Sequence, residues 1–245
     1  MTHGFFTTVF SQPLYNGLIF LITLIPFADA GVAIVIFTVL VRLVLFPLSK
    51  KSIEAQMKLK GAEGEIARIK EKFKDKTQQA TKIMEFYRAR GLNPFSGFVL
   101  ILIQIPIVLA LYQIFLRSGL PVVNSDLLYQ FVRVPESINM NFLGVLDITK
   151  NSYLLALITA LTQYFQAKLA MPPTKPAQAS DTFKDNLARS MSVQMKYFFP
   201  VVVFFIVYNL SGTIALYWIT TNLFSILQEW YVRKRFARPN SVKVV

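Results

Sequence analysis

The stretch GVAIVIFTVLVRLVLFPL, residues 31–48, decides the fold class of this chain. Its residues are apolar apart from Thr38 and Arg42. A helix that crosses a bilayer needs about 20 mostly apolar residues, so this stretch predicts a membrane-spanning helix. Four more stretches predict spans of the same kind, namely residues 95–115, 153–170, 197–210 and 213–230. The stretch 197–210 is short, so either the bilayer is thinner there or its helix begins earlier, near Val193.

The composition agrees with a membrane protein. Of the 245 residues, 54% are hydrophobic and 16% are charged, against roughly 25% charged residues in an ordinary soluble domain. The chain has 22 Phe and no Cys, which argues against a soluble enzyme, a disordered chain and a disulfide scaffold. Its 26 Lys and Arg outnumber its 13 Asp and Glu, which gives a net charge of +13. We therefore expect an all-α integral membrane protein with basic aqueous faces.

The distribution of Lys and Arg predicts the orientation of the spans. Residues 1–30 contain none, 49–92 contain twelve, 116–151 contain three, and 168–196 and 229–245 contain five each. Segments rich in Lys and Arg stay on the cytoplasmic side of a membrane. Five spans with the N-terminus outside and the C-terminus inside place all three strongly basic segments in the cytoplasm.

This topology divides the chain into ten segments. The outer side holds an interfacial amphipathic helix (1–30) and a loop (117–151). The cytoplasmic side holds a helical hairpin (49–93), a loop (171–194) and a basic tail (232–245). The five transmembrane helices cover 31–48, 94–116, 152–170, 195–210 and 212–231.

The first thirty residues have two interpretations. Ala28-Asp29-Ala30 follows an apolar run and is typical of a signal-peptidase site. However, no Lys or Arg precedes that run, and Pro26 would break a spanning helix near its end. We favour a helix that lies in the outer membrane interface, with Tyr15, Asn16 and Thr23 at its wet edge.

The polar segment 49–93 has the pattern of helices. Apolar residues recur at intervals of three, four and seven and predict an apolar stripe. Lys74–Thr77 interrupts this stripe, which predicts two antiparallel arms. Gly61 and Gly64 weaken the first arm by about 1 kcal/mol each relative to Ala. A solvated connector is the alternative, although connectors of this length are usually functional.

The sequence offers little catalytic chemistry. Its one histidine is His3, it has no cysteine, and residues 49–93 lack a phosphate-binding G-x-x-x-x-G-K-[ST] loop. We therefore expect a protein that is not an enzyme, with no catalytic residues, no metal and no cofactor.

Arg42 is the residue that most needs an explanation, because a central Arg costs about 2.5–3.5 kcal/mol on insertion. Its side chain could snorkel toward Lys50, about 12 Å along the helix. Alternatively, it could line a water-filled cavity that opens to the cytoplasm. We favour the cavity, because we expect no acidic residue within any span and therefore no ion pair for Arg42 inside the bundle. Further polar residues of the spans would line the interior or join helices through hydrogen bonds, among them Thr38, Gln104, Gln163, Thr221 and Asn222.

Several short motifs, taken in order, make the chain from about Ser11 to Phe236 resemble the YidC/Oxa membrane protein insertase family. They are Ser11-Gln12-Pro13-Leu14, the Thr38, Arg42 and Pro47-Leu48 pattern, Asn93-Pro94, Gln104-Ile105-Pro106-Ile107, Ser211-Gly212, Leu216-Tyr217-Trp218 and Thr221-Asn222-Leu223. The family often has Tyr where Trp218 stands. The chain is similar to the family's compact bacterial form.

The resemblance implies a hydrophilic groove that is open to the cytoplasm and to lipid and closed outside. A nascent membrane segment places its polar tail in the groove, where Arg42 attracts acidic residues, and no nucleotide is hydrolysed. The groove residues that it implies are Arg42, Thr38, Gln104, Gln163, Tyr217 and Trp218. The apolar part of the substrate would slide along the second and fourth spans, at Ile105, Val108 and Phe204.

The resemblance also implies a location and partners. The location is the bacterial cytoplasmic membrane, where the protein would be multi-pass. The partners are nascent membrane proteins, the lipid bilayer, and the ribosome through weak contacts of the hairpin and the basic tail. The Sec translocon and the signal recognition particle pathway are further candidates. Two other functions stay open: a small-solute transporter or channel with Arg42 as an anion site, and a chaperone that translocates nothing.

Overall fold

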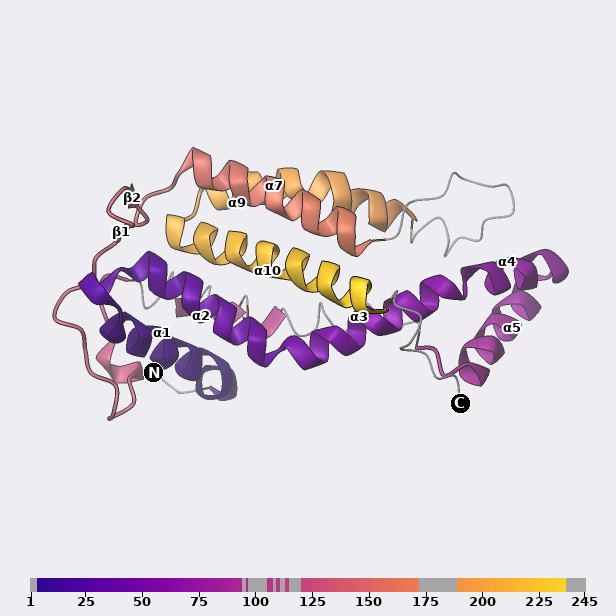
Figure 1. Ribbon diagram of the computed structural model, residues 1–245, viewed down its shortest axis with the longest axis horizontal. Helices are drawn as coiled ribbons and strands as arrows, with labels where there is room; N and C mark the ends of the chain where they lie inside the picture. The colour runs from indigo at the N-terminus through magenta and orange to yellow at the C-terminus, as the bar shows by residue number, and fades with distance from the viewer. Residues whose placement is uncertain are drawn as a thin grey trace.

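The computed structural model describes residues 4–93, 96, 105–107, 109–110, 113–114, 120–171 and 189–236. Most of the predicted second span, including Gln104 and Val108, lies outside these residues. Figure 1 shows an elongated, mostly helical molecule. One end holds α1 (Gln12–Leu24), the start of α2 (Ala30–Val44) and a short hairpin of β1 (Asn141–Phe142) and β2 (Leu146–Asp147). The other end holds α4 (Glu63–Lys72) and α5 (Lys76–Ala89).

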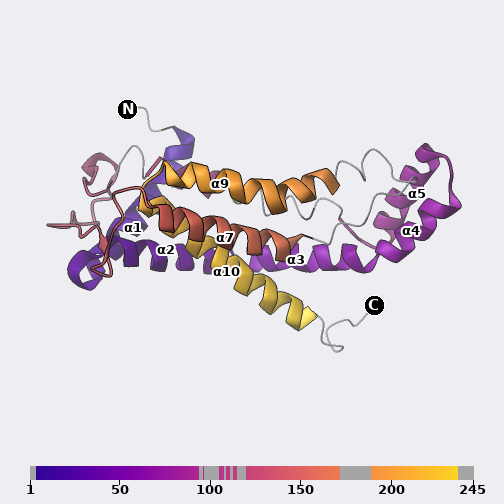
Figure 2. The ribbon, with the colours of Figure 1, turned by 90° about the horizontal axis from the view of Figure 1, so that it is seen from above.

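Three long helices and a bent one lie between these ends. α10 (Gly212–Phe236) packs against α7 (Tyr153–Ala170) on one side and against α2 and α3 (Phe46–Gly61) on the other. α9 (Phe199–Tyr208) packs on α7. Figure 2 shows that the C-terminal end of α10 diverges from the line of α7 and α9.

Proline and an aspartate cap fix the connection from α1 to α2. Ile25 precedes Pro26 and is extended, with φ −83° and ψ 133°, as expected for a residue before proline. α1 therefore ends at Leu24, which confirms that Pro26 terminates this helix. Asp29 then begins α2 by accepting a hydrogen bond from the Val32 N–H at 3.0 Å.

The face of α1 that we expected at the wet edge is buried against the loop that precedes β1. Tyr15 is 0% exposed, and its hydroxyl accepts a hydrogen bond from the Asn124 N–H at 2.7 Å. Asn16 is 3% exposed and bonds Leu127 O (2.8 Å) and the Tyr129 N–H (2.6 Å). The expectation was wrong for both residues because the loop's backbone groups need partners where they are buried. Thr23 is exposed.

The hairpin of β1 and β2 is bonded to the start of α2. The Ala30 N–H donates to Asn139 O (2.9 Å), and the Asn139 N–H donates to Ala28 O (3.0 Å). The Leu143 N–H donates to the second carboxylate oxygen of Asp29 at 2.8 Å. Ala28-Asp29-Ala30, which resembles a peptidase site, is thus hydrogen-bonded into this end of the fold.

The stretch 31–48 folds as two helices rather than as one. α2 ends at Val44, α3 begins at Phe46, and their axes differ by 61°. Pro47 stands in the first turn of α3. It cannot donate a backbone hydrogen bond, and its ring would clash with the carbonyl four residues earlier in a continuous helix. The bend therefore follows directly from Pro47.

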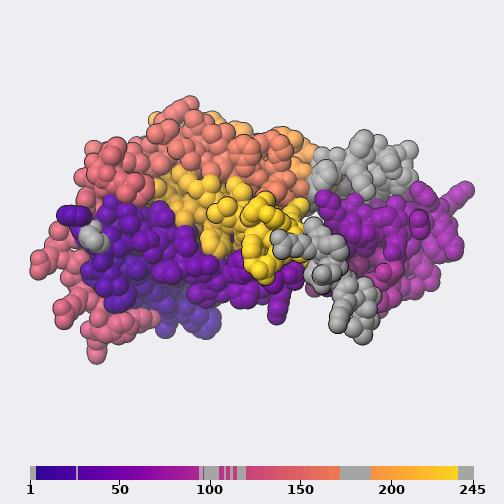
Figure 3. Space-filling model, viewed as in Figure 1, coloured from indigo at the N-terminus to yellow at the C-terminus, as the bar shows by residue number. Residues whose placement is uncertain are grey.

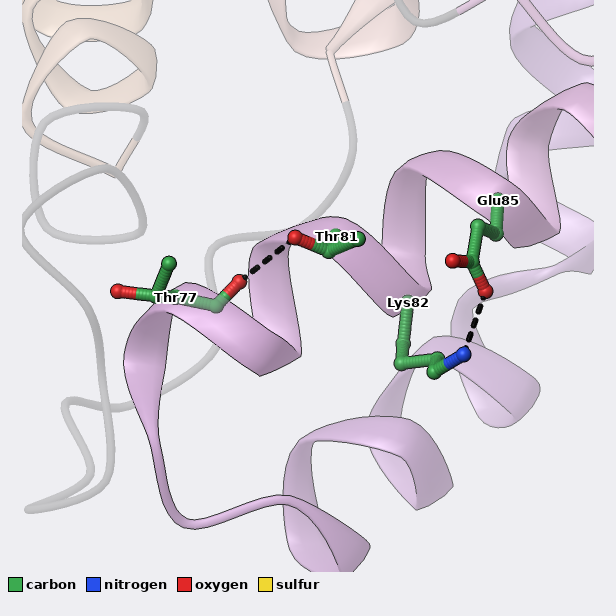
Figure 4. A network of polar contacts seen from close by, with 4 residues as sticks. All are labelled: Thr77, Thr81, Lys82 and Glu85. Carbon is green, nitrogen blue, oxygen red and sulfur yellow. Dashed lines mark hydrogen bonds and ion pairs between the residues drawn. The ribbon is translucent and has the colours of Figure 1, made fainter.

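The basic segment after the bend forms helices, as the sequence predicts. α3 ends at Gly61, and α4 and α5 fold back on each other around Phe73–Asp75, which confirms the predicted interruption of the stripe. Asp75 caps α5 through the Thr77 N–H (2.8 Å), and Arg90 pairs with Glu65 at 3.0 Å. Figure 4 shows two contacts within α5: the Thr81 hydroxyl on Thr77 O (3.0 Å), and Lys82 paired with Glu85 at 2.7 Å.

The helix that contains α9 begins earlier than its apolar stretch. It runs from Arg189 to Tyr208, 20 residues, and includes a π-helical turn at Gln194–Phe198. In the part of the chain that the structure describes, it is the one helix long and apolar enough to cross a membrane by itself. α2 and α3 meet the same criteria together as a bent pair. The count of five spans therefore stays a prediction.

Candidate functional site

The C-terminal half of α10 buries several polar side chains and exposes several large apolar ones. Asn222 and Glu229 are 4% and 7% exposed, whereas Leu223 and Leu227 are 48% and 65% exposed. A helix on the surface of a soluble protein has the opposite arrangement, with its apolar stripe facing the core. The outer face of α10 thus suits hydrocarbon, and its inner face suits polar contacts.

α7 also buries polar side chains among apolar ones, and α2 buries one, Thr38, beyond the apolar residues Ala30, Ala33 and Ile34. On α7, Thr159 and Gln163 are buried while Leu161 and Phe165 are exposed. On α2, Thr38 is buried while exposed side chains follow it on the outer face, namely Leu40, Leu43 and Val44. We call the buried polar residues of the three helices the polar interior and define it by Thr38, Thr159, Gln163, Thr221 and Asn222.

The interior changes character along the molecule. Near the β-hairpin, the buried residues form an apolar core, which includes Leu18, Ile22, Ile34, Ile148, Leu155, Val207 and Ile214. Toward α3, polar residues become more frequent among the buried ones: those of the polar interior are followed by Ser49, Ser52, Gln228 and Glu229, alongside Ile53 and Val232. The end beside the β-hairpin is therefore packed with apolar side chains, and buried polar groups are more frequent toward α3.

Arg42 lies at the edge of the polar interior. It stands in the last turn of α2, one turn after Thr38, where a cation also complements the partial negative charge of a helix C-terminus. Its side chain is half-buried. Tyr217, which is buried on α10, lies close enough to Arg42 to interact with it electrostatically. The Thr38 hydroxyl donates to Ile34 O at 2.6 Å. Arg42 of α2 and Tyr217 of α10 thus lie near each other, and Thr38 lies one turn before Arg42 on α2.

Side-chain hydrogen bonds join α7 to α10. The Trp218 indole N–H donates to Gln163 Oε1 at 2.9 Å, and the Asn222 amide donates to the Thr162 hydroxyl at 3.2 Å. Gln163 also reaches Gln166 at 3.4 Å. Trp218 therefore belongs to the same polar cluster as Gln163, and both are positioned by packing between two helices.

The remaining predicted site residues lie apart from this cluster or outside the described residues. Phe204 is half-buried on α9, where its ring contacts Tyr153 and Tyr208 at centroid distances of 5.3 and 6.3 Å. Ile105 is exposed. Gln104 and Val108 are among the residues that the structure does not describe.

Sequence reasoning missed two charged residues of the interior. Glu229 lies within the predicted last span, is 7% exposed and pairs with Arg233 at 2.8 Å. The expectation that the bundle holds no acidic side chain was therefore wrong. The position of Glu229 on the helix face opposite Leu223 and Leu227 is the sequence signal that could have predicted its burial. Lys196, in the π-helical turn before α9, is 7% exposed.

The polar interior also contains an unused hydrogen-bonding group. Among the described residues, the buried Thr221 hydroxyl has no hydrogen-bond partner. Buried polar groups almost always have a partner, which can be a water molecule. Within the same residues, His, Cys, Asp and Glu form no cluster that could hold a metal ion. The Thr221 hydroxyl is therefore available to bind water or a polar group.

Comparison with known proteins adds independent evidence. The family model described as 60Kd inner membrane protein matches residues 22–239. A membrane protein insertase YidC of Francisella tularensis subsp. novicida is 30% identical over 207 residues, which cover 84% of this chain and 33% of the relative. A protein of the same name from Francisella philomiragia is 28% identical over the same length. The chain thus spans about a third of the length of the curated relatives it matches.

Proposed function

This chain belongs to the 60Kd inner membrane protein family, the YidC/Oxa family of helical integral membrane proteins, and we propose that it inserts nascent membrane proteins into the lipid bilayer. The observation that carries the proposal is the set of buried polar side chains on α2, α7 and α10 beside large apolar side chains that are exposed on the same helices. The polar interior lies on their buried faces, and Leu40, Leu161 and Leu223 are exposed on their outer faces. A substrate with a short polar tail and an apolar helix needs both surfaces.

In this proposal, the polar tail of the substrate enters from the cytoplasm into the space beside Thr38, Arg42 and Gln163. An unsatisfied polar group in hydrocarbon costs several kcal/mol, and the hydrogen-bonding side chains of the interior lower that cost. Arg42 attracts acidic tail residues. Gln104, Tyr217 and Trp218 contribute further polar groups. No nucleotide or cofactor takes part in this step.

The apolar part of the substrate leaves the polar interior sideways into lipid. We assign this path to the second and fourth spans, with contacts at Ile105, Val108 and Phe204. The apolar core near the β-hairpin keeps the outer end closed while the substrate enters from the other end. The tail crosses when its polar groups pass this closed end, with the membrane potential aiding acidic tails.

The proposal includes a topology and a location. The protein is multi-pass in the bacterial cytoplasmic membrane, with five spans, its N-terminus outside and its C-terminus inside. The positive charge of the segment 49–92 supports the cytoplasmic assignment of α4 and α5. Nascent membrane proteins are its substrates, and the ribosome meets the hairpin and the basic tail through weak contacts. The Sec translocon and the signal recognition particle pathway cooperate with it.

Cross-linking to ribosome-bound nascent chains tests this function. The chain has no cysteine, so Thr38→Cys and Leu40→Cys each introduce a single attachment point for a thiol-specific photo-crosslinker. Thr38 is 2% exposed in the polar interior, and Leu40, two residues away, is 47% exposed on the outer face. An insertase gives adducts from Thr38 to the polar tail of a stalled membrane protein, and Leu40 gives none to that tail.

The same experiment separates the alternative functions. A solute transporter or channel gives no nascent-chain adduct from either position. A chaperone that translocates nothing gives adducts with completed proteins only. Either outcome would overturn the proposed insertase activity.

A further inference from the structure

The C-terminal half of α10 carries an exposed apolar stripe that ends in positive charge. Leu223, Leu227 and Trp230 are 48%, 65% and 57% exposed, at intervals of four and three residues. Lys234 follows four residues later and therefore lies on the same helix face. The opposite face, with Gln228 and Val232, is buried. Figure 3 shows this end of α10 at the surface of the molecule.

Two aromatic rings hold the cations at the end of the stripe. The Lys234 ammonium lies 4.9 Å from the centroid of the Trp230 ring, and the Arg235 guanidinium lies 5.1 Å from that of Tyr231. These four side chains line a pocket of about 280 Å³. Contacts with aromatic faces position a cation without neutralising its charge.

The charges of this pocket remain uncompensated by carboxylates in the described part of the chain. Glu229, the acidic residue of this helix end, pairs with Arg233 at 2.8 Å. The ion pairs among the described residues include neither Lys234 nor Arg235. The pocket therefore presents two positive charges to an anionic ligand.

The dimensions of the stripe fit one leaflet of a bilayer. Leu223 and Lys234 are eleven residues apart, about 16 Å along a helix, and one leaflet contributes about 15 Å of hydrocarbon. Trp and Tyr concentrate at membrane interfaces, and Lys and Arg reach anionic headgroups just beyond them. The apolar stripe, the two rings and the two cations thus occur in the order of acyl chain, interface and headgroup.

We propose that this surface binds an anionic phospholipid of the cytoplasmic leaflet. Its acyl chains lie along Leu223, Leu227 and Trp230, and its phosphate occupies the pocket between Lys234 and Arg235. An RNA phosphate would use the two cations but would leave the apolar stripe uncovered, so the stripe favours a lipid. This inference rests on the membrane location of the family and does not depend on insertase activity.

Quenching of tryptophan fluorescence by brominated lipids tests the proposal. The full chain is reconstituted in phosphatidylcholine vesicles with a fixed fraction of either brominated phosphatidylglycerol or brominated phosphatidylcholine. The emission of Trp218 is measured in Trp230→Phe and subtracted. We expect brominated phosphatidylglycerol to occupy the site beside Trp230 about fivefold more than brominated phosphatidylcholine, which corresponds to ~1 kcal/mol for one basic contact.

Variants separate a built site from diffuse positive charge. Lys234→Gln with Arg235→Gln should bring the ratio close to one. The exchange Lys234→Arg with Arg235→Lys should keep the ratio, as should the control Lys58→Gln with Lys60→Gln on exposed positions of α3. Equal quenching by the two lipids in the wild type would overturn the proposal. The proposal would also be overturned if the quenching ratio stayed the same without Lys234 and Arg235, or if it fell equally in the Lys58 and Lys60 control. Binding of an RNA oligonucleotide to these cations with unchanged lipid selectivity would overturn it as well.

Discussion

Replacement of Asn16 by Ala should loosen the loop that covers α1. The Asn16 amide donates to Leu127 O at 2.8 Å and its oxygen accepts the Tyr129 N–H at 2.6 Å. The substitution leaves these two backbone groups without a side-chain partner, at a cost of about 1–3 kcal/mol for each group that stays dry. Residues 127 and 129 are half-buried, so water can reach them in part. We therefore expect the lower end of the range, ~2 kcal/mol in all.

Amide hydrogen exchange measures this effect directly. A loss of ~2 kcal/mol in local opening free energy corresponds to about 30-fold faster exchange, and it should be confined to residues 124–132. Thr23→Ala is the matched control, because the Thr23 hydroxyl is exposed on the same helix and bonds only Phe20 O at 2.7 Å among the contacts described. Exchange in Asn16→Ala that equals the wild type or Thr23→Ala would refute the structural role assigned to Asn16.

Three further predictions concern other parts of the molecule. Burial raises the pKa of the Tyr15 phenol above 10.0, and the hydrogen bond from the Asn124 N–H opposes this shift. The fold therefore favours the neutral phenol. This contribution to the free energy of unfolding is complete below pH 10 and is lost as the pH rises through the folded pKa. The difference in phenolate absorbance between wild type and Tyr15→Phe should titrate above pH 10, and a midpoint at or below 10 contradicts the burial. Gly31→Ala places a β-carbon against the Phe142 ring and should weaken the docking of the β-hairpin by about 1–3 kcal/mol. Faster amide hydrogen exchange at residues 139–148 measures this effect, and unchanged exchange argues against the contact. Deletion of residues 61–87 with a short linker should leave the other helices folded, because α4 and α5 pack on each other rather than on α7 or α10. Circular dichroism and protease protection measure this. The deletion should nevertheless impair insertion, and full insertion activity in vivo would show that the hairpin is only a connector.

The sequence predicted those elements whose signals are local. The apolar stretch 153–170 coincides with α7, because Ser152 caps the helix at its start, with its hydroxyl 3.4 Å from the Leu155 N–H. The turn at Phe73–Asp75 follows from the polar interruption of a helical stripe. The bend at Leu45 also has a local cause, Pro47, although an apolar stretch by itself predicts one continuous helix.

Contacts between distant segments could not be predicted from these patterns. Tyr15 and Asn16 are polar and were placed at the wet edge, but their partners lie more than 100 residues away in the loop before β1. The candidate site shows the same limit. Intramembrane polar residues could be recognised as a class, whereas the pairing of Gln163 with Trp218 depends on how α7 packs against α10.

Arg42 provides the most direct test of the central claim, that a positively charged polar interior receives the tail of a nascent membrane protein. A tail carboxylate ~8 Å from the guanidinium gains about 2 kcal/mol at an effective dielectric constant of ~20, or about 30-fold in occupancy. The measurement is insertion of one short-tailed substrate, with an acidic or a neutral tail, in depleted cells that carry wild type or a variant at position 42. Lys51→Ala, at an exposed basic position beyond the bend, is the control.

The account predicts that Arg42→Lys and Lys51→Ala insert the acidic substrate like the wild type. Arg42→Ala should lose most of that insertion while retaining part of its activity on the neutral tail, and Arg42→Glu should lose more. If Arg42 only anchors its helix, Arg42→Ala removes an insertion cost of about 2.5–3.5 kcal/mol and loses little activity. Equal insertion of the acidic substrate by wild type and Arg42→Ala would contradict the account.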